Sequence, residues 1–115
     1  MARKRKFYSL TRYIDETCEN IKTGYIQRDG FDVPNDFGLD LAVYRSIDTK
    51  TQLKIWYVVD CCCGLSVGSG YTQREAVSSS LEKLAKVDMK AYAEKAKKSI
   101  ETYGEVPGHR IMYLH

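Results

Sequence analysis

The chain has 115 residues, of which 43% are hydrophobic and 29% charged, and its net charge is +3. This length allows one domain of ordinary size and excludes a multidomain enzyme. The composition is typical of a soluble globular protein. The first residues, Met1–Lys6 (MARKRK), lack the apolar stretch of a secretory signal, and no apolar run reaches the roughly 20 residues of a membrane span. We therefore expect a cytoplasmic protein with no membrane partner.

Apolar residues recur at helical spacing near the start of the chain. They are Leu10, Tyr13, Ile14, Cys18 and Ile21. Steps of three and four residues line one face of a helix, so a helix is predicted over residues 9–23. The following residues, 24–38, contain three glycines and one proline without a sustained period. They predict a long loop.

The middle of the chain changes to strand chemistry. Two strands are predicted at Leu41–Ser46 (LAVYRS) and Leu53–Asp60 (LKIWYVVD), joined by a short polar hairpin. A third strand, Leu65–Gly68, follows a turn at Gly64. Together they predict a three-stranded antiparallel meander.

Two helices are predicted in the second half of the chain. Thr72 and Glu75 have the spacing of a capping box, which predicts a helix over residues 72–86. Asp88 is suited to cap a second helix over residues 89–103, which Gly104 ends. Residues 105–115 are expected to form a tail or, through Arg110–Leu114 (RIMYL), an edge strand.

These elements predict an α+β fold in the order α-β-β-β-α-α. The three-stranded antiparallel sheet carries helices packed on one face. Residues 1–8 form a basic N-terminal arm, residues 9–104 a single domain and residues 105–115 the C-terminal segment. Nine tyrosines and an exposed edge strand are compatible with a homodimer.

Charge is distributed unevenly along the chain. Residues 1–12 carry +5, residues 13–48 carry -5 and residues 49–115 carry +3. Four aspartates recur every three or four residues in and just after the predicted loop, and three aromatic residues lie near them. We expect these residues to bind a partner, the carboxylates in an arginine-rich groove and the rings as apolar anchors. The set is Asp29, Asp32, Asp36, Asp40, Tyr25, Phe31 and Phe37.

Catalytic and metal-binding patterns are not evident. Cys61, Cys62 and Cys63 are adjacent, so on a strand their sulfurs point alternately to opposite faces and do not chelate one ion together. The sequence contains no phosphate loop, His-Glu-x-x-His motif or nucleophile elbow. We therefore expect a protein without enzymatic activity, metal or cofactor.

The segment Gly68–Ala76, GSGYTQREA, resembles the Gly-x-Gly-x-Ser-Lys-Lys-x-Ala motif of double-stranded RNA-binding domains. The predicted order of helix, three strands and helix over residues 9–86 is similar to that family as well. The resemblance implies nucleic-acid binding, in which basic residues at the start of the last helix contact phosphates. Arg74 is the basic residue retained here, and the arm adds Arg3, Lys4, Arg5 and Lys6.

A short Tyr- and Lys-rich chain with a basic start, an acidic segment and no catalytic signature is similar to accessory proteins of bacteriophages and mobile elements. Anti-CRISPR proteins are one such class, and they commonly block an RNA-guided nuclease by binding in place of nucleic acid. This resemblance implies a phage-type inhibitor or regulator of a nucleic-acid-processing protein in a bacterial host cell. Direct nucleic-acid binding is the alternative.

Overall fold

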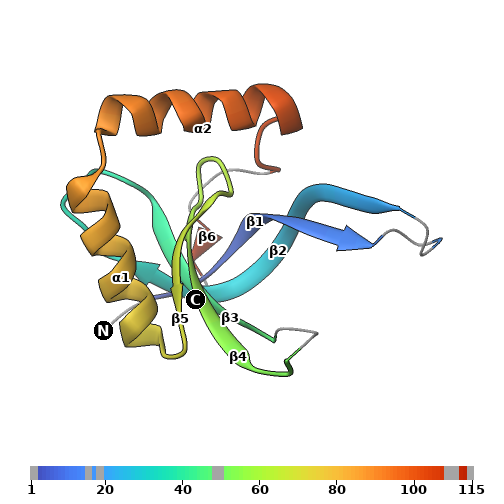
Figure 1. Ribbon diagram of the computed structural model, residues 1–115, viewed down its shortest axis with the longest axis horizontal. Helices are drawn as coiled ribbons and strands as arrows, with labels where there is room; N and C mark the ends of the chain where they lie inside the picture. Colours follow the sequence, from blue (N-terminus) through green and yellow to red (C-terminus); the bar gives the residue numbers. More distant parts are fainter. Residues whose placement is uncertain (1–2, 15–16, 18–19, 48–50, 108–111, 114–115) are drawn as a thin grey trace.

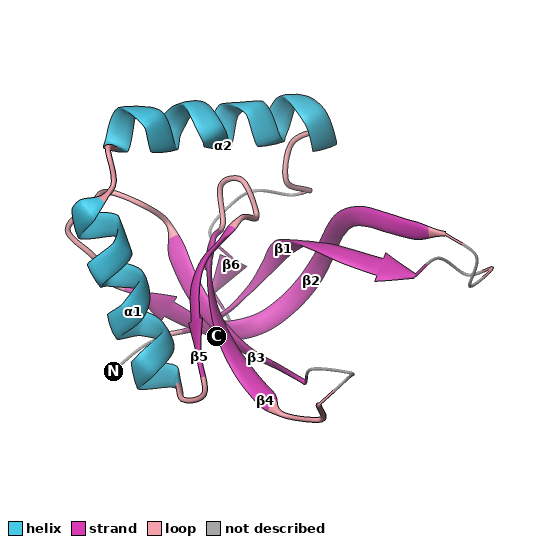
Figure 2. Cartoon of the chain, in the orientation of Figure 1, coloured by secondary structure: helices cyan, strands magenta, loops and turns pink. Residues whose placement is uncertain are grey.

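The computed structural model describes residues 3–14, 17, 20–47, 51–107 and 112–113. Among them, five strands precede two helices, and a two-residue strand follows. The strands are β1 (Lys4–Ile14), β2 (Ile21–Val33), β3 (Leu41–Ile47), β4 (Lys54–Asp60), β5 (Ser66–Gly70) and β6 (Met112–Tyr113), and the helices are α1 (Gln73–Lys86) and α2 (Met89–Tyr103). The fold is α+β, with both helices late in the chain (Figure 1, Figure 2).

All described strands form one antiparallel sheet in the order β5-β4-β3-β2-β1-β6. The meander of β3, β4 and β5 is confirmed, but two long strands extend it. β1 pairs with β2 along its whole length, from Lys4 opposite Phe31 to Ile14 opposite Ile21. β2 then pairs with β3 only through Phe31–Val33.

For the described residues, the helix predicted over residues 9–23 is therefore wrong, as is most of the loop predicted over 24–38. Residues 15–16 and 18–19 of that helix lie outside the described residues. In β1, the alternate residues Arg5, Phe7 and Ser9 are buried, which is the period of two that a strand requires. The segment is rich in aromatic and β-branched residues, which favour a strand once a partner is present. Residues 4–8 of the predicted basic arm belong to β1.

The C-terminal segment contributes the edge strand β6, which lies next to β1. Met112 and Tyr113 pair with Lys6 and Arg5 of β1. They lie inside the segment 110–114, for which an edge strand was one of two expectations. Arg110, Ile111 and Leu114 are outside the described residues.

The sheet curls, so that a turn after β4 reaches β1. The Leu10 amide donates a hydrogen bond of 2.8 Å to the Gly64 carbonyl, although β1 lies three strands from β4 in the sheet. The inner face of this curl buries Phe7, Tyr44 and Cys61. The Arg28 guanidinium lies 4.8 Å from the centre of the Tyr44 ring and donates to the Ser9 hydroxyl.

The outer face carries the helices, as expected. Leu41, Val43 and Val58 of the sheet pack with Ala76 and Leu84 of α1. Both predicted helices are confirmed with their caps. The Thr72 hydroxyl accepts from the Glu75 amide at 3.1 Å, and the Asp88 carboxylate accepts from the Lys90 amide at 3.0 Å.

Helix α1 packs closely on β5 because the β5 residue that faces Ser80 of α1 is a glycine, Gly68. A Cβ on Gly68 would lie 2.2 Å from the Ser80 Oγ and 3.1 Å from the Ser80 Cα. Ser80 is fully buried and its hydroxyl donates to the Ala76 carbonyl at 2.7 Å. The contact therefore has no room for a methyl group.

Replacing Gly68 with alanine should destabilise the protein by about 2 kcal/mol, because α1 must move away from the sheet. Urea unfolding followed by circular dichroism measures this. The exposed neighbour provides the control, and Ser69→Ala should change stability by less than about 0.5 kcal/mol. Equal stability of the two variants would contradict this account of the packing.

Candidate functional site

The four predicted partner-binding aspartates separate into two pairs. Asp32 and Asp40 turn toward the buried guanidinium of Arg5, whose side chain is 1% exposed. Asp29 and Asp36 are exposed. Two of the four expected surface charges are therefore neutralised within the protein.

The Arg5 contacts define a clamp, by which we mean Arg5 with Asp32 and Asp40. Arg5 Nη1 and Nη2 donate to the two carboxylate oxygens of Asp40, the second at 3.2 Å, and Nη1 also lies 3.4 Å from Asp32. Burial alone would lower the pKa of Arg5, but the hydrogen bond and charge of Asp40 raise it above its ordinary value. The guanidinium is therefore charged, and the two-pronged geometry is the strong form of this pair.

Asp40 is the last residue of the connection between β2 and β3, residues 34–40, and Asp32 lies in β2 just before it. The Asn35 side chain organises the interior of this loop. Its amide donates to the carbonyls of Val33 and Leu39 at 3.1 and 2.8 Å, and its oxygen accepts from the amide of Phe37 at 3.0 Å. The loop is thus held at both ends by the clamp and internally by Asn35, with the Asp36 side chain facing solvent.

The three predicted aromatic anchors all make contacts within the protein. Phe31 and Phe37 pack against the core on the helix side of the sheet. The Tyr25 hydroxyl donates to the Gly104 carbonyl at 2.6 Å and so ties β2 to the end of α2. All three rings are half-buried.

The predicted nucleic-acid-binding residues are also divided by the fold. Arg5 is buried in the clamp, and Lys6 lies half-buried opposite Asp29 in the register of β1 and β2. Arg3, Lys4 and Arg74 are exposed. The pairing of β1 with β2 therefore places the basic start of the chain beside the acidic segment instead of apart from it.

The turn after β4, residues 61–63, is connected to α2 by a hydrogen bond between Asp60 and Tyr92 that the sequence did not suggest. Asp60 is 3% exposed, and its carboxylate accepts from the Tyr92 hydroxyl at 2.7 Å and from the Cys62 amide at 2.9 Å. Burial and the bond to Asp60 raise the pKa of Tyr92. The sequence signal that could have indicated this contact is the position of Asp60 directly after the apolar residues Val58 and Val59. An acid buried at the end of such a strand needs a hydrogen-bond partner.

The thiols of this turn are protonated at neutral pH. Burial and the Asp60 charge raise the pKa of Cys63 from 9.0 to about 11. Burial and the charges of Asp60 and Asp40 raise the pKa of the exposed Cys62 as well. A nucleophilic or metal-binding cysteine needs a lowered pKa, and the environment here acts in the opposite direction.

A cavity of about 560 Å³ lies between α2 and the loop of residues 34–40. Asp40, Asp60, Cys62, Tyr92 and Ile100 are among its lining residues. Its walls are mostly apolar side chains, and the carboxylates of Asp40 and Asp60 already have partners in Arg5, Tyr92 and the Cys62 amide. In the described residues, no three His, Cys, Asp or Glu side chains are grouped to hold a metal ion.

No family model matches this sequence, and neither the curated proteins nor the solved structures include a significant match to it. Among the described residues, no helix has the length and apolar character needed to cross a membrane.

The clamp should contribute measurably to the free energy of unfolding. Asp40→Asn is expected to lower the free energy of unfolding by about 2–3 kcal/mol, because it leaves the buried Arg5 charge with a weaker partner. The matched control is Asp36→Asn, which removes the same charge from an exposed position and should cost less than about 0.5 kcal/mol. Chemical denaturation of both variants measures the difference. Similar losses would show that Arg5 does not depend on Asp40.

The raised thiol pKa values predict alkaline destabilisation. Since the folded pKa of Cys63 exceeds its ordinary value of 9.0, its contribution is complete below pH 9 and is lost as pH rises through about 11. Stability measured by urea unfolding in reductant should fall over this range. Cys63→Ala should make that fall smaller. An unchanged pH profile in the variant would assign the effect elsewhere.

Proposed function

We propose that the protein is a non-enzymatic binding protein that inhibits or regulates a protein that processes nucleic acid. An RNA-guided nuclease of a bacterial cell is the partner we test, with this protein acting in the manner of an anti-CRISPR protein. The observation that carries the proposal is the loop of residues 34–40. It is held by the clamp and by Asn35, and it presents Asp36 to solvent.

A loop ordered before binding loses little conformational entropy when a partner docks. The Asn35 bonds and the packing of Phe37 and Leu39 against the core supply that order here. The outward carboxylates of Asp36 and Asp29 then complement a basic groove that otherwise holds phosphates. Two exposed charges replace the four expected from the sequence, so the acidic contact surface is smaller.

Binding without turnover is supported by the state of the polar groups near the cavities. The Asp60 carboxylate is occupied by Tyr92 and the Cys62 amide, and the Cys62 thiol has a raised pKa. Neither group is arranged as a nucleophile with an adjacent base. The proposed action takes place where the nuclease works, in the bacterial cytoplasm.

Direct nucleic-acid binding is the second candidate, and one observation favours it. The two helices carry exposed basic side chains, although exposed glutamates are interspersed among them. The basic residues are Arg74, Lys83, Lys86, Lys90, Lys95, Lys97 and Lys98. The element order, with strands in place of the first helix, differs from that of a double-stranded RNA-binding domain.

The proposal predicts that Asp29→Lys combined with Asp36→Lys abolishes inhibition. The assay measures DNA cleavage by a panel of bacterial RNA-guided nucleases, each with its guide RNA, with and without this protein. The unchanged protein should inhibit at least one nuclease, and the charge-reversed protein should fail at about tenfold higher concentration. Both aspartates are exposed, so circular dichroism should show an intact fold.

The control is Glu82→Lys combined with Glu94→Lys, which makes the same charge change on the exposed helices and should leave inhibition intact. Failure of the protein to inhibit any nuclease would overturn the proposed partner. Retention of duplex RNA or DNA in a gel shift, weakening steeply between about 50 and 200 mM salt, would instead support the second candidate.

A further inference from the structure

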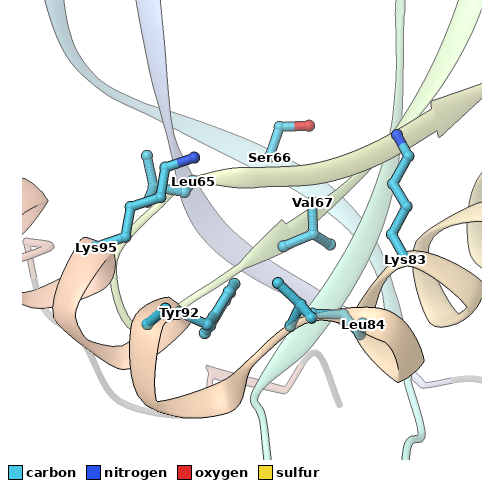
Figure 3. Close-up of a pocket in the computed structure, with 9 residues that line it drawn as sticks. Leu65, Ser66, Val67, Lys83, Leu84, Tyr92 and Lys95 are labelled. Carbon is cyan, nitrogen blue, oxygen red and sulfur yellow. The ribbon is translucent and has the colours of Figure 1, made fainter.

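A second cavity lies at the corner between α1 and α2, over β5. Its volume is about 270 Å³, and apolar side chains of Leu65, Val67, Leu84, Val87 and Tyr92 line it. Figure 3 shows Lys83 of α1 and Lys95 of α2 on opposite sides of these side chains. We call this cavity with its two lysines the corner pocket.

The walls of the corner pocket are fixed from two directions. The Tyr92 ring is held by its hydroxyl, which donates to the buried Asp60 carboxylate. Leu84 is 4% exposed and belongs to the core that α1 forms with the sheet. The pocket therefore exists before any ligand arrives, which favours binding.

The two lysines give the corner pocket its polarity. Both are exposed, and the described part of the chain has no ion pair joining Lys83 or Lys95 to a carboxylate. Each lysine belongs to a different helix, so the ammonium groups flank the apolar floor from two sides. The site thus matches a group that is apolar at its centre and negatively charged on both flanks.

The size and openness of the pocket favour one side chain of a protein over a free small molecule. Small-molecule sites usually enclose about 300–1,000 Å³, and this pocket is smaller. It is also open at the rim, where Val87 is 41% exposed. Pockets of this kind receive single aromatic anchors at protein interfaces.

We propose that the corner pocket binds a partner protein through one aromatic side chain flanked by acidic residues. The aromatic ring occupies the apolar floor, and the flanking carboxylates pair with Lys83 and Lys95. This inference deepens the proposed function, since it rests on a protein partner and adds a second contact surface to the one at Asp29 and Asp36. It does not depend on which protein the partner is.

The test uses a synthetic probe, the blocked peptide Glu-Glu-Phe-Glu-Glu, titrated into the full chain and followed by methyl NMR. We expect saturable shifts of the methyl groups of Val67, Leu84 and Val87. A peptide with alanine in place of phenylalanine, or with lysines in place of the glutamates, should bind at least about tenfold more weakly. Equal binding of all three peptides would overturn the proposal.

Two variants separate charge from shape. Lys83→Glu combined with Lys95→Glu should weaken the probe peptide about tenfold or more, whereas Lys90→Glu combined with Lys98→Glu makes the same charge change outside the pocket and should not. Ala91→Trp fills the pocket without changing charge and should also abolish the methyl shifts. Equal weakening by the two charge variants would show only a general attraction.

Further outcomes distinguish this inference from the proposed function. Free phenylacetate binding as tightly as the peptide would assign the pocket to a small carboxylate and overturn the protein segment. Peptide binding without inhibition of any nuclease would retain the pocket and overturn the nuclease as partner. Inhibition that survives both Lys83→Glu with Lys95→Glu and Ala91→Trp would retain the nuclease and remove the pocket from that interface.

Discussion

The structure depends on a charged group placed where water is nearly excluded. The Arg5 side chain is 1% exposed, and the two terminal nitrogens of its guanidinium pair with Asp40 and Asp32. A buried cation is tolerated only when its partners are close and well oriented, so β1, the end of β2 and the start of β3 must come together as a unit. The connection of residues 34–40 is short and closed by the same guanidinium, and it is ordered for that reason.

The clamp also determines which charges reach the surface. Asp32 and Asp40 are drawn toward Arg5, whereas Asp29 and Asp36 remain outside. The register of β1 with β2 further sets Lys6 opposite Asp29, so opposite charges that occupy different parts of the sequence become neighbours on one hairpin. The protein therefore presents small acidic and basic sites instead of one acidic and one basic end.

Tyrosine hydroxyls attach α2 to the rest of the fold. Tyr92 donates to Asp60 near the beginning of the helix, and Tyr25 donates to Gly104 directly after its end. Ser99 is the one buried residue of α2, and Tyr92 and Ile100 are half-buried, so these bonds add to a partial apolar contact in holding the helix over the sheet. A helix held in this way leaves cavities beside it, and the corner pocket is one of them.

Local chemistry in the sequence determined the α+β class, the meander of β3, β4 and β5, and both helices with their caps. Those features depend on neighbouring residues: alternation in a strand, a turn at Gly64, and a hydroxyl or carboxylate before a helix. Local spacing could not determine β1 and β2. Tyr13 and Ile14 follow Leu10 by three and four residues, and this spacing fits a helix as well. Only pairing of the two segments along their whole length favoured the strands.

The functional surfaces were decided by the tertiary structure. Arg5 meets Asp32 and Asp40 across 27 and 35 residues of sequence, and Tyr92 meets Asp60 across 32. Local sequence patterns carry no information about contacts between residues so far apart in the chain. The sequence therefore identified the acidic and basic residues but could not divide them into buried and exposed sets. By itself the sequence determined which charged and aromatic side chains the protein has. The curl of the sheet decided which of them are buried and which face solvent, because a buried charge needs a nearby charge of opposite sign.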